Sequence, residues 1–360
     1  MLPLPRLVLA LAAALFAGAV AQGSGGEMTS AQMREAYAGP PESWPAPQLD
    51  EGAVFTEFGP FPSTPRPDAA QQARIDLGEK LFKDPRLSAS GQIACESCHN
   101  RRLGWGDGLP VSFGHDRQTG PRNAMPLFAA AHMKELFWDG RSASLEDQAH
   151  LPIVNPVEMA GEAGAIEARI NGIPEYRAGF RAAYGLETIR IADIARAIAE
   201  FERAIPPPRS KWDQVFSEGT RVLTDEELLG LHLFRTRAGC ANCHNGPLLT
   251  DQRYHNLGIS FYGRRLQDVG RWGVTGDPAD VGRFRTPSLR GVRRTAPYMH
   301  NGIFPHLPGV VNLYAGGGGI DRQEQSTTTA APPPGPDPLL KKRELTEEEK
   351  AALVAFLETL

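Results

Sequence analysis

The sequence predicts a mainly α-helical protein that consists of two tandem modules with long loops. Residues 77–83 are repeated at 229–235, with leucine, glycine and phenylalanine at matching positions. A Cys-x-x-Cys-His sequence follows each copy, at 95–99 and at 240–244. Thr224 and Glu227 form a capping box at the start of the second copy, in which each side chain accepts a hydrogen bond from the other's backbone amide. These three observations favour a duplicated helical unit.

The first residues carry the pattern of a secretory signal peptide. Arg6 precedes an apolar run over residues 7–20, and Ala19 and Ala21 give the small-x-small pattern of a cleavage site before Gln22. The run has about 14 residues, whereas a helix that spans a bilayer needs roughly 20. We therefore expect removal of residues 1–21, a mature chain without a membrane span, and a periplasmic location. Residues 22–68 form an N-terminal extension rich in Pro and Gly, to which no function is assigned.

The four cysteines form two widely separated pairs, and each pair is followed directly by a histidine. Two disulfides, a four-thiolate zinc site and a thioredoxin-like redox pair are the alternatives, and none of them explains the histidines. Two thiols at this spacing can form thioethers to the vinyl groups of one haem, and the adjacent imidazole can then bind its iron. The sequence thus predicts two covalently bound haem c groups in two tandem cytochrome c-like helical modules. The residues concerned are Cys95, Cys98 and His99 for one haem, and Cys240, Cys243 and His244 for the other.

Helix signals divide the rest of the chain. Three consecutive prolines at 206–208 cannot continue the helical run over 191–205, so the predicted modules are residues 69–210 and 211–360. Residues 323–337, rich in Thr, Pro and Ala, are expected to form a surface loop or a flexible insertion. A second capping box, Thr346 with Glu349, opens the last helix. The residues expected to pack from this helix onto the C-terminal module are Leu353, Phe356, Leu357 and Leu360.

Composition and charge narrow the class of protein. With 41% hydrophobic residues among 360, the chain can bury a sizeable core and is globular. Its formal net charge of −4 is small for this length, which argues against nucleic acid and against an anionic membrane surface as partners.

Five segments, residues 81–88, 120–123, 137–141, 155–159 and 295–298, resemble the bacterial di-haem cytochrome c peroxidase and MauG family. The resemblance covers about residues 77–360 and implies that the N-terminal haem is the peroxide site. It also implies that Glu158 and Gln148 lie in the distal pocket. A carboxylate there can take the proton from the near oxygen of a peroxide and deliver it to the far one, and the amide can orient the substrate. The alternative for Glu158 is an ordinary surface acid.

The resemblance implies two further features between the haems. Trp138 matches a tryptophan that lies between the two redox centres, although a tryptophan can equally be part of a core. Asn123, with the backbone carbonyls of Thr295 and Pro297, matches an inter-haem calcium site, and such oxygen ligands suit a hard cation. The alternative for Asn123 is a turn cap.

Iron ligands opposite the proximal histidines are expected to differ between the haems. His115 matches a mobile loop whose histidine binds the peroxidatic haem in the resting state of many such peroxidases, unless it lies in solvent. Family peroxidases usually place a methionine opposite the proximal histidine of the second haem. Counting 12 positions from Gly302 reaches Tyr314, a MauG-like ligand, and the same count from Gly140 reaches Pro152, which offers none. Met159 and Met299 remain alternative ligands.

Three functions follow from these expectations. The first is reduction of hydrogen peroxide with electrons from a small periplasmic cytochrome c or cupredoxin. The second is a MauG-like enzyme that stores the oxidising equivalents of peroxide on its two haems and oxidises Trp or Tyr side chains of a partner protein. The third is a non-enzymatic di-haem electron carrier, against which Pro152 and Glu158 argue.

Overall fold

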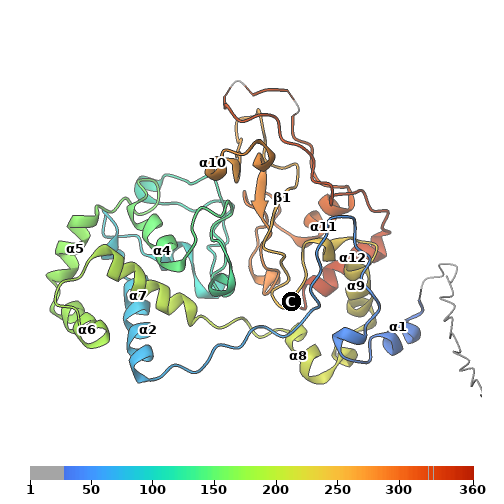
Figure 1. Cartoon of the computed structure of the whole chain (residues 1–360), viewed down its shortest axis with the longest axis horizontal. Helices are drawn as coiled ribbons and strands as arrows, with labels where there is room; N and C mark the ends of the chain where they lie inside the picture. The colour runs from blue at the N-terminus through green and yellow to red at the C-terminus, as the bar shows by residue number, and fades with distance from the viewer. Residues whose placement is uncertain (1–27, 323, 327) are drawn as a thin grey trace, which may run out of the picture.

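A computed structural model describes residues 28–360 apart from 323 and 327. Its helices are α1 (Ser30–Ala36), α2 (Ala69–Phe82), α3 (Cys95–Cys98), α4 (Leu145–Val154), α5 (Ala163–Asn171), α6 (Pro174–Tyr184), α7 (Ile191–Arg203), α8 (Lys211–Glu218), α9 (Asp225–Arg235), α10 (Trp272–Thr275), α11 (Leu307–Ala315) and α12 (Glu347–Leu357), and its strands are β1 (Tyr254–Asn256) and β2 (Arg283–Arg285). Figure 1 shows α2 and α4–α7 on one side of the molecule and α9, α11 and α12 on the other. The mainly α-helical prediction is confirmed.

Two separate hydrophobic cores support the predicted modules. Side chains of α2 and α4–α7 make one core, and side chains of α8, α9, α11 and α12 make the other. All four residues expected to pack from the end of the chain belong to the second core. Between the cores, the backbone has no helix from Ala204 to Ser210. We therefore propose that the modules divide in this segment, as the three prolines suggested.

The repeated glycine lies at a close crossing of two helices in each module. A Cβ atom on Gly78 of α2 would lie 1.9 Å from the backbone oxygen of Ala197 in α7. A Cβ atom on Gly230 of α9 would lie 2.0 Å from the backbone oxygen of Ala352 in α12. Each module thus has one helix crossing that is too close for any side chain. The capping boxes predicted for α9 and α12 are both present.

The N-terminal extension is packed against the C-terminal module, although its composition is rich in Pro and Gly. The predicted signal peptide at 1–21 lies outside the described residues. Within the extension, however, Met33, Tyr37, Trp44 and Phe58 are buried in the core of the C-terminal module. Residues before α2 therefore cross to the far module, a contact that low periodicity in sequence gave no means to predict. Among the described residues, no helix has the length and apolar character needed to cross a bilayer.

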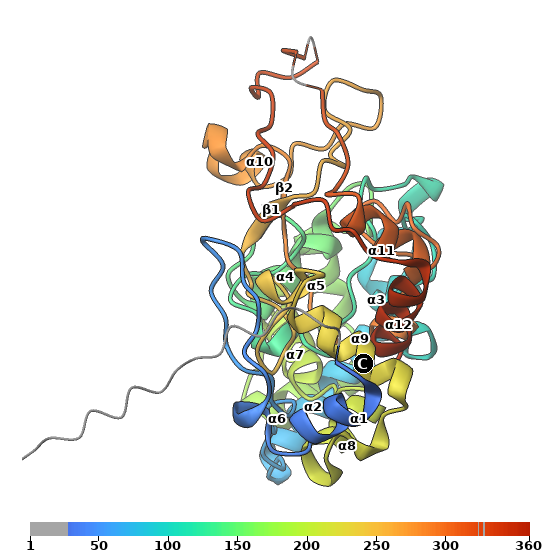
Figure 2. The same ribbon diagram turned by 90° about the vertical axis from the view of Figure 1, so that its right-hand side faces the viewer.

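An additional lobe projects from the C-terminal module. Strands β1 and β2 pair antiparallel, with His255 opposite Phe284. Figure 2 shows them with α10 and the segment that precedes α12, which extends well beyond the helices. The predicted surface loop at 323–337 has no helix or strand in its described part, but Ala331 is fully buried and its oxygen accepts from Tyr262 Oη at 2.6 Å. This part of the loop is packed rather than free in solvent.

Candidate haem and peroxide sites

Each Cys-x-x-Cys-His sequence lies at the wall of its own cavity. The cysteines of each pair lie on a short helical turn or at its end, α3 in the first module and Cys240–Asn242 in the second. All four cysteines are free thiols, so no disulfide competes for them. The first cavity is lined by Cys95, Cys98 and His99, and the second by Cys240, Cys243 and His244.

Both histidines are oriented for metal binding through one ring nitrogen. His99 Nδ1 lies 2.9 Å from Trp105 O, and His244 Nδ1 lies 3.1 Å from Leu249 O. A proton on Nδ1 that is donated to a carbonyl leaves Nε2 as the free ligand atom. Burial lowers the pKa of both imidazoles, which favours the neutral form that a metal requires. Unpaired thiols, neutral imidazoles and cavity walls fit a covalently attached haem in each module.

The first cavity has a polar wall made by α4 and the segment that follows it. Gln148 and Pro152 of α4 and Glu158 after it all line this cavity, together with the haem-attachment residues. Glu158 Oε1 accepts from Asn155 Nδ2 at 3.0 Å, which holds the carboxyl group in place. Burial raises the pKa of Glu158 above its ordinary 4.5, while Arg141 and this hydrogen bond oppose the shift. The wall therefore offers a carboxyl group and an amide, and Pro152 adds no side-chain donor to it.

His115 lies on the loop after Gly114, next to the segment that carries Glu158. Its backbone amide donates to Val157 O at 3.0 Å and to Glu158 O at 2.7 Å. Gly114 lines the first cavity, but among the described residues that line it the side chain of His115 is absent. Its Nδ1 is buried and has no hydrogen-bond partner among the described residues. The loop and the Glu158 segment are thus joined through the backbone, so movement of one would disturb the other.

The second cavity has a different far wall. Tyr314 lies on α11 at the position that Pro152 has on α4, and it lines the second cavity with Met299 and His300. Burial raises the pKa of the Tyr314 phenol, so the phenol stays protonated unless a cation stabilises the anion. The 12-residue count from the two glycines thus placed both residues at cavity walls. The phenol is available to an iron in this cavity.

Trp138 lies between the two cavities and lines both. Its Nε1 donates to Asn123 O at 3.0 Å, and its own carbonyl accepts from the backbone amide of Arg285 at 2.8 Å. The second bond joins the first module to β2 of the second, and the first bond holds the indole within its own module. Asn123 also lines both cavities, and Thr295 and Pro297 line the second, so the three predicted calcium ligands lie around one region.

Comparison with known proteins identifies the family to which this chain belongs. A family model described as di-haem cytochrome c peroxidase matches residues 72–221. Cytochrome-c peroxidase IdrP1 of Pseudomonas sp. (strain SCT) is 37% identical over 291 residues, which cover 72% of this chain and 77% of that protein. The chain belongs to the di-haem cytochrome c peroxidase family. It is therefore a di-haem peroxidase, an oxidoreductase with two haem c groups.

Other relatives extend the comparison. Methylamine utilization protein MauG of Methylorubrum extorquens is 35% identical over 277 residues, or 76% of this peroxidase and 77% of MauG. A crystal structure of a MauG-like protein associated with microbial copper homeostasis has 31% identity and a TM-score of 0.71, and the match covers 88% of this chain and 93% of that one. The diheme peroxidase BthA from Burkholderia thailandensis E264 has a TM-score of 0.67 over 88% of this chain and 94% of its own, but at 23% identity it shows the shared fold alone.

Sequence reasoning missed two buried acid–base groups at the cavities of this peroxidase. Glu202 of α7 lines the first cavity, where burial raises its pKa to about 8 and its Oε2 has no hydrogen-bond partner in the described part of the chain. His255 lines the second cavity between Asp337 at 2.8 Å and Asp251 at 2.9 Å. Burial alone would lower the pKa of His255, but its hydrogen bonds outweigh burial and raise the pKa to about 12. The two carboxylates thus favour the protonated form of an imidazole that lines the second cavity. For Glu202, a signal was present in the sequence, because it is an acid on an otherwise apolar face of α7. For His255, no such signal was present.

Proposed function

We propose that this enzyme reduces hydrogen peroxide to water in the periplasm, with electrons from a small cytochrome c or cupredoxin. The observation that carries the proposal is the polar wall of the first cavity, where Glu158 and Gln148 lie beside Pro152. Each turnover consumes one peroxide, two electrons and two protons, and releases two waters. The N-terminal signal pattern supports export to the compartment in which such donors occur.

The side chains of the first cavity would handle the protons of this reaction. Haem c supplies the iron redox chemistry when it is bound. Glu158 would accept a proton from one oxygen of the peroxide and donate it to the other oxygen, which assists cleavage of the O–O bond and release of water. Gln148 orients the peroxide by donating and accepting hydrogen bonds. The pKa of Glu158 is raised by burial, which brings it nearer to the operating pH, where a group can both accept and release a proton.

Electrons would enter at the second haem and pass to the first by way of Trp138. This indole is the aromatic group that lines both cavities, and it is held at its Nε1 and at its carbonyl. In the resting oxidised enzyme, His115 would bind the first iron and leave when the loop moves. Gly114 permits that movement, because glycine has few conformational restrictions.

Calcium forms part of the proposal. Asn123 with the backbone oxygens of Thr295 and Pro297 would bind one calcium ion at the border of the modules. The three residues come from both modules and all line the second cavity, and their oxygen atoms suit a hard cation. Binding there would hold the two haem sites at a constant separation.

Tyr314 favours a second candidate. A phenolate ligand stabilises ferric iron, whereas the thioether of methionine favours ferrous iron and a high potential. With Tyr314 at the second iron, the enzyme would retain oxidising equivalents for Trp or Tyr side chains of a partner protein, as a MauG-like enzyme. A di-haem carrier without enzymatic activity is disfavoured by the acid, the amide and the proline at the first cavity.

Steady-state and stopped-flow measurements on the holoenzyme separate these candidates. Rapid, peroxide-dependent oxidation of reduced cytochrome c or cupredoxin is the expected result. Absence of such turnover, together with a peroxide-induced spectrum that persists until a protein substrate is added, would overturn it in favour of the MauG-like candidate. Failure of cyanide and carbon monoxide to bind at either haem would instead identify a carrier.

A further inference from the structure

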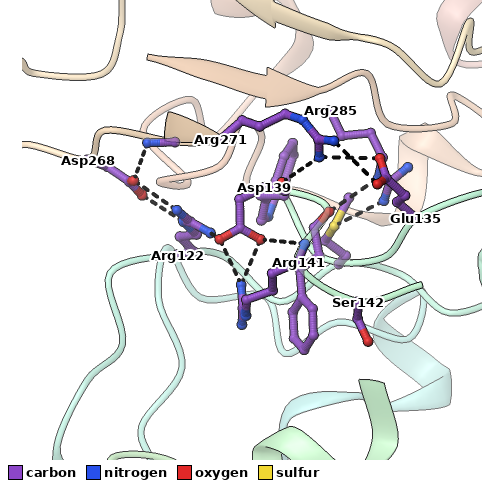
Figure 3. A network of polar contacts seen from close by, with 12 residues as sticks. Arg122, Glu135, Asp139, Arg141, Ser142, Asp268, Arg271 and Arg285 are labelled. Carbon is purple, nitrogen blue, oxygen red and sulfur yellow. Dashed lines mark hydrogen bonds and ion pairs between the residues drawn. The ribbon is translucent and has the colours of Figure 1, made fainter. Parts of the chain in front are cut away.

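Three arginines line the first cavity, and they differ in their partners. Arg122 pairs with Asp139 at 2.5 Å and with Asp268 at 2.7 Å. Arg141 pairs with the same Asp139 at 3.0 Å. Figure 3 shows this network around Asp139, with Arg285 at its edge. Arg285 lines the cavity as well, but it has no ion pair with any described residue.

The guanidinium of Arg285 has only weak or neutral acceptors in the protein. Its Nε donates to Phe137 O at 3.2 Å, its Nη1 to Met133 Sδ at 3.1 Å and its Nη2 to Met125 Sδ at 3.4 Å. Thioether sulfur is a weak acceptor. Phe137, Met133 and Met125 all line the first cavity, so the guanidinium lies at the wall of that cavity.

The nearest acid is already engaged. Glu135 interacts with Arg285 only at longer range, and its carboxylate accepts from Tyr254 Oη at 2.6 Å and pairs with Arg271 at 3.2 Å. Burial lowers the pKa of Arg285 to about 10, so its side chain remains a cation at neutral pH.

Other buried arginines of the chain show what this environment lacks. Arg235 is 1% exposed and pairs with Glu57 at 2.5 Å. Arg290 is 3% exposed and pairs with Asp213 at 2.7 Å. Arg285 is 4% exposed and has no such partner among the described residues. A buried charge is stable only when it is paired or hydrogen-bonded to an anion. The described residues supply no anion to Arg285 within ion-pair distance, so the cavity is the place from which such an anion could reach it.

We propose that Arg285 binds a propionate carboxylate of the haem in the first cavity and is its counter-ion. Haem c is the anionic group that this cavity is built to hold, and a planar guanidinium suits a carboxylate because it can donate two parallel hydrogen bonds. Arg285 also lines the second cavity and donates its backbone amide to the carbonyl of Trp138. The residue therefore connects the haem carboxylate with the indole between the haems. The inference concerns cofactor binding and holds for either candidate function.

The test uses the di-haem holoenzyme with Arg285→Gln, Arg285→Lys and the control Arg290→Gln. Because a nearby positive charge favours ferrous over ferric iron, Arg285→Gln should lower the reduction potential of the N-terminal haem more than that of the C-terminal haem. Resonance Raman spectra should show a shifted propionate bending band for this haem. Arg285→Lys keeps the charge but loses the planar pair of donors, so it should restore most of the potential and leave the propionate band shifted. Arg290→Gln, outside both cavities, should change neither.

A wild-type potential and a wild-type propionate band in Arg285→Gln would overturn the proposal. They would mean that a small anion or water, rather than the haem, is the partner of Arg285. If Arg285→Gln does not fold with two haems, the lysine variant decides, because an unshifted propionate band in that folded protein also rejects the contact. Neither readout depends on peroxide turnover, so failure here is distinguishable from failure of the proposed reaction.

Discussion

The two haem cavities are alike on one side and different on the other. The near side carries the cysteine pair and the histidine, and the far side carries Pro152 in the first cavity and Tyr314 in the second. In both, a cysteine pair and a histidine line the cavity, and the histidine bonds a carbonyl of a residue with positive φ, Trp105 at 64° and Leu249 at 53°. Opposite them, the first cavity has Pro152 with a carboxyl group and an amide, and the second has Tyr314. The Cys-x-x-Cys-His residues therefore repeat between the two cavities, while other residues that line the cavities differ.

The segment between the cavities shows the same divergence at one pair of residues. Phe137 and Met299 are matching residues with φ of 66° and 75°, and each precedes a left-handed glycine by three positions, Gly140 and Gly302. The next residue is Trp138 in the first copy and His300 in the second, and their rings are 6.4 Å apart. Equivalent backbone thus brings two different aromatic groups together at the border of the modules. The backbone repeats, and chemistry depends on the side chains placed on it.

The largest expected effect tests whether the near sides are equivalent. Replacing Cys95 and Cys98 together by alanine should remove one covalent haem completely, because no thiol remains to form a thioether in the first cavity. Mass spectrometry of the exported protein measures this loss. The matched variant, with Cys240 and Cys243 replaced, should lose the other haem, and a double variant that retains both haems would reject the attachment sites.

The next effect tests the far side of the first cavity. Glu158→Gln should lower peroxide turnover by roughly 10²- to 10⁴-fold, the usual contribution of positioned proton transfer. Since burial raises the pKa of Glu158, wild-type kcat/KM should fall as the pH drops through a value above 4.5, and this limb should vanish in the variant. The exposed Glu175→Gln, outside both cavities, is the control. Turnover equal to wild type, in a variant that still binds cyanide in a separate measurement, would remove Glu158 from the mechanism.

A smaller effect is expected from the far side of the second cavity. If the phenolate of Tyr314 binds iron, Tyr314→Met should raise the potential of the C-terminal haem, because a neutral thioether favours the ferrous state. A tenfold change in the reduced-to-oxidised ratio corresponds to about 59 mV for one electron, and we expect a shift of at least that size. Tyr262→Phe, buried outside both cavities, should cause none. An unmoved potential with an unchanged low-spin EPR signal would show that Tyr314 is only a packed aromatic.

Sequence patterns predicted what is local in this molecule. The capping boxes are confirmed because each joins two residues three positions apart. The attachment motifs and the 12-residue count led to residues that line the cavities, and the roles of those residues stay predictions. The patterns did not place Trp44 and Phe58 in the second core, nor pair His255 with Asp337 across 82 positions. Such contacts join segments that lie far apart in the chain, and no periodicity records them. The roles of Glu158, Trp138 and Tyr314 came from resemblance and stay predictions, and the structure shows that these residues line the cavities.

The smallest expected effect compares the helix crossings of the two modules. At Gly78 and at Gly230, an added Cβ would meet a backbone oxygen that cannot rotate away, so each helix pair must separate. Gly78→Ala and Gly230→Ala should each lower the free energy of unfolding by about 1–3 kcal/mol, the usual cost of overpacking, even though alanine favours a helix. Gly164→Ala in α5 is the control, because its Cβ meets only the flexible Glu162 side chain at 3.4 Å. Denaturant midpoints followed by circular dichroism, with haem absorbance as a second probe, measure all three. Equal losses at the two repeat glycines would show that the modules share one packing solution, and a loss at only one would show that the other crossing can widen without cost.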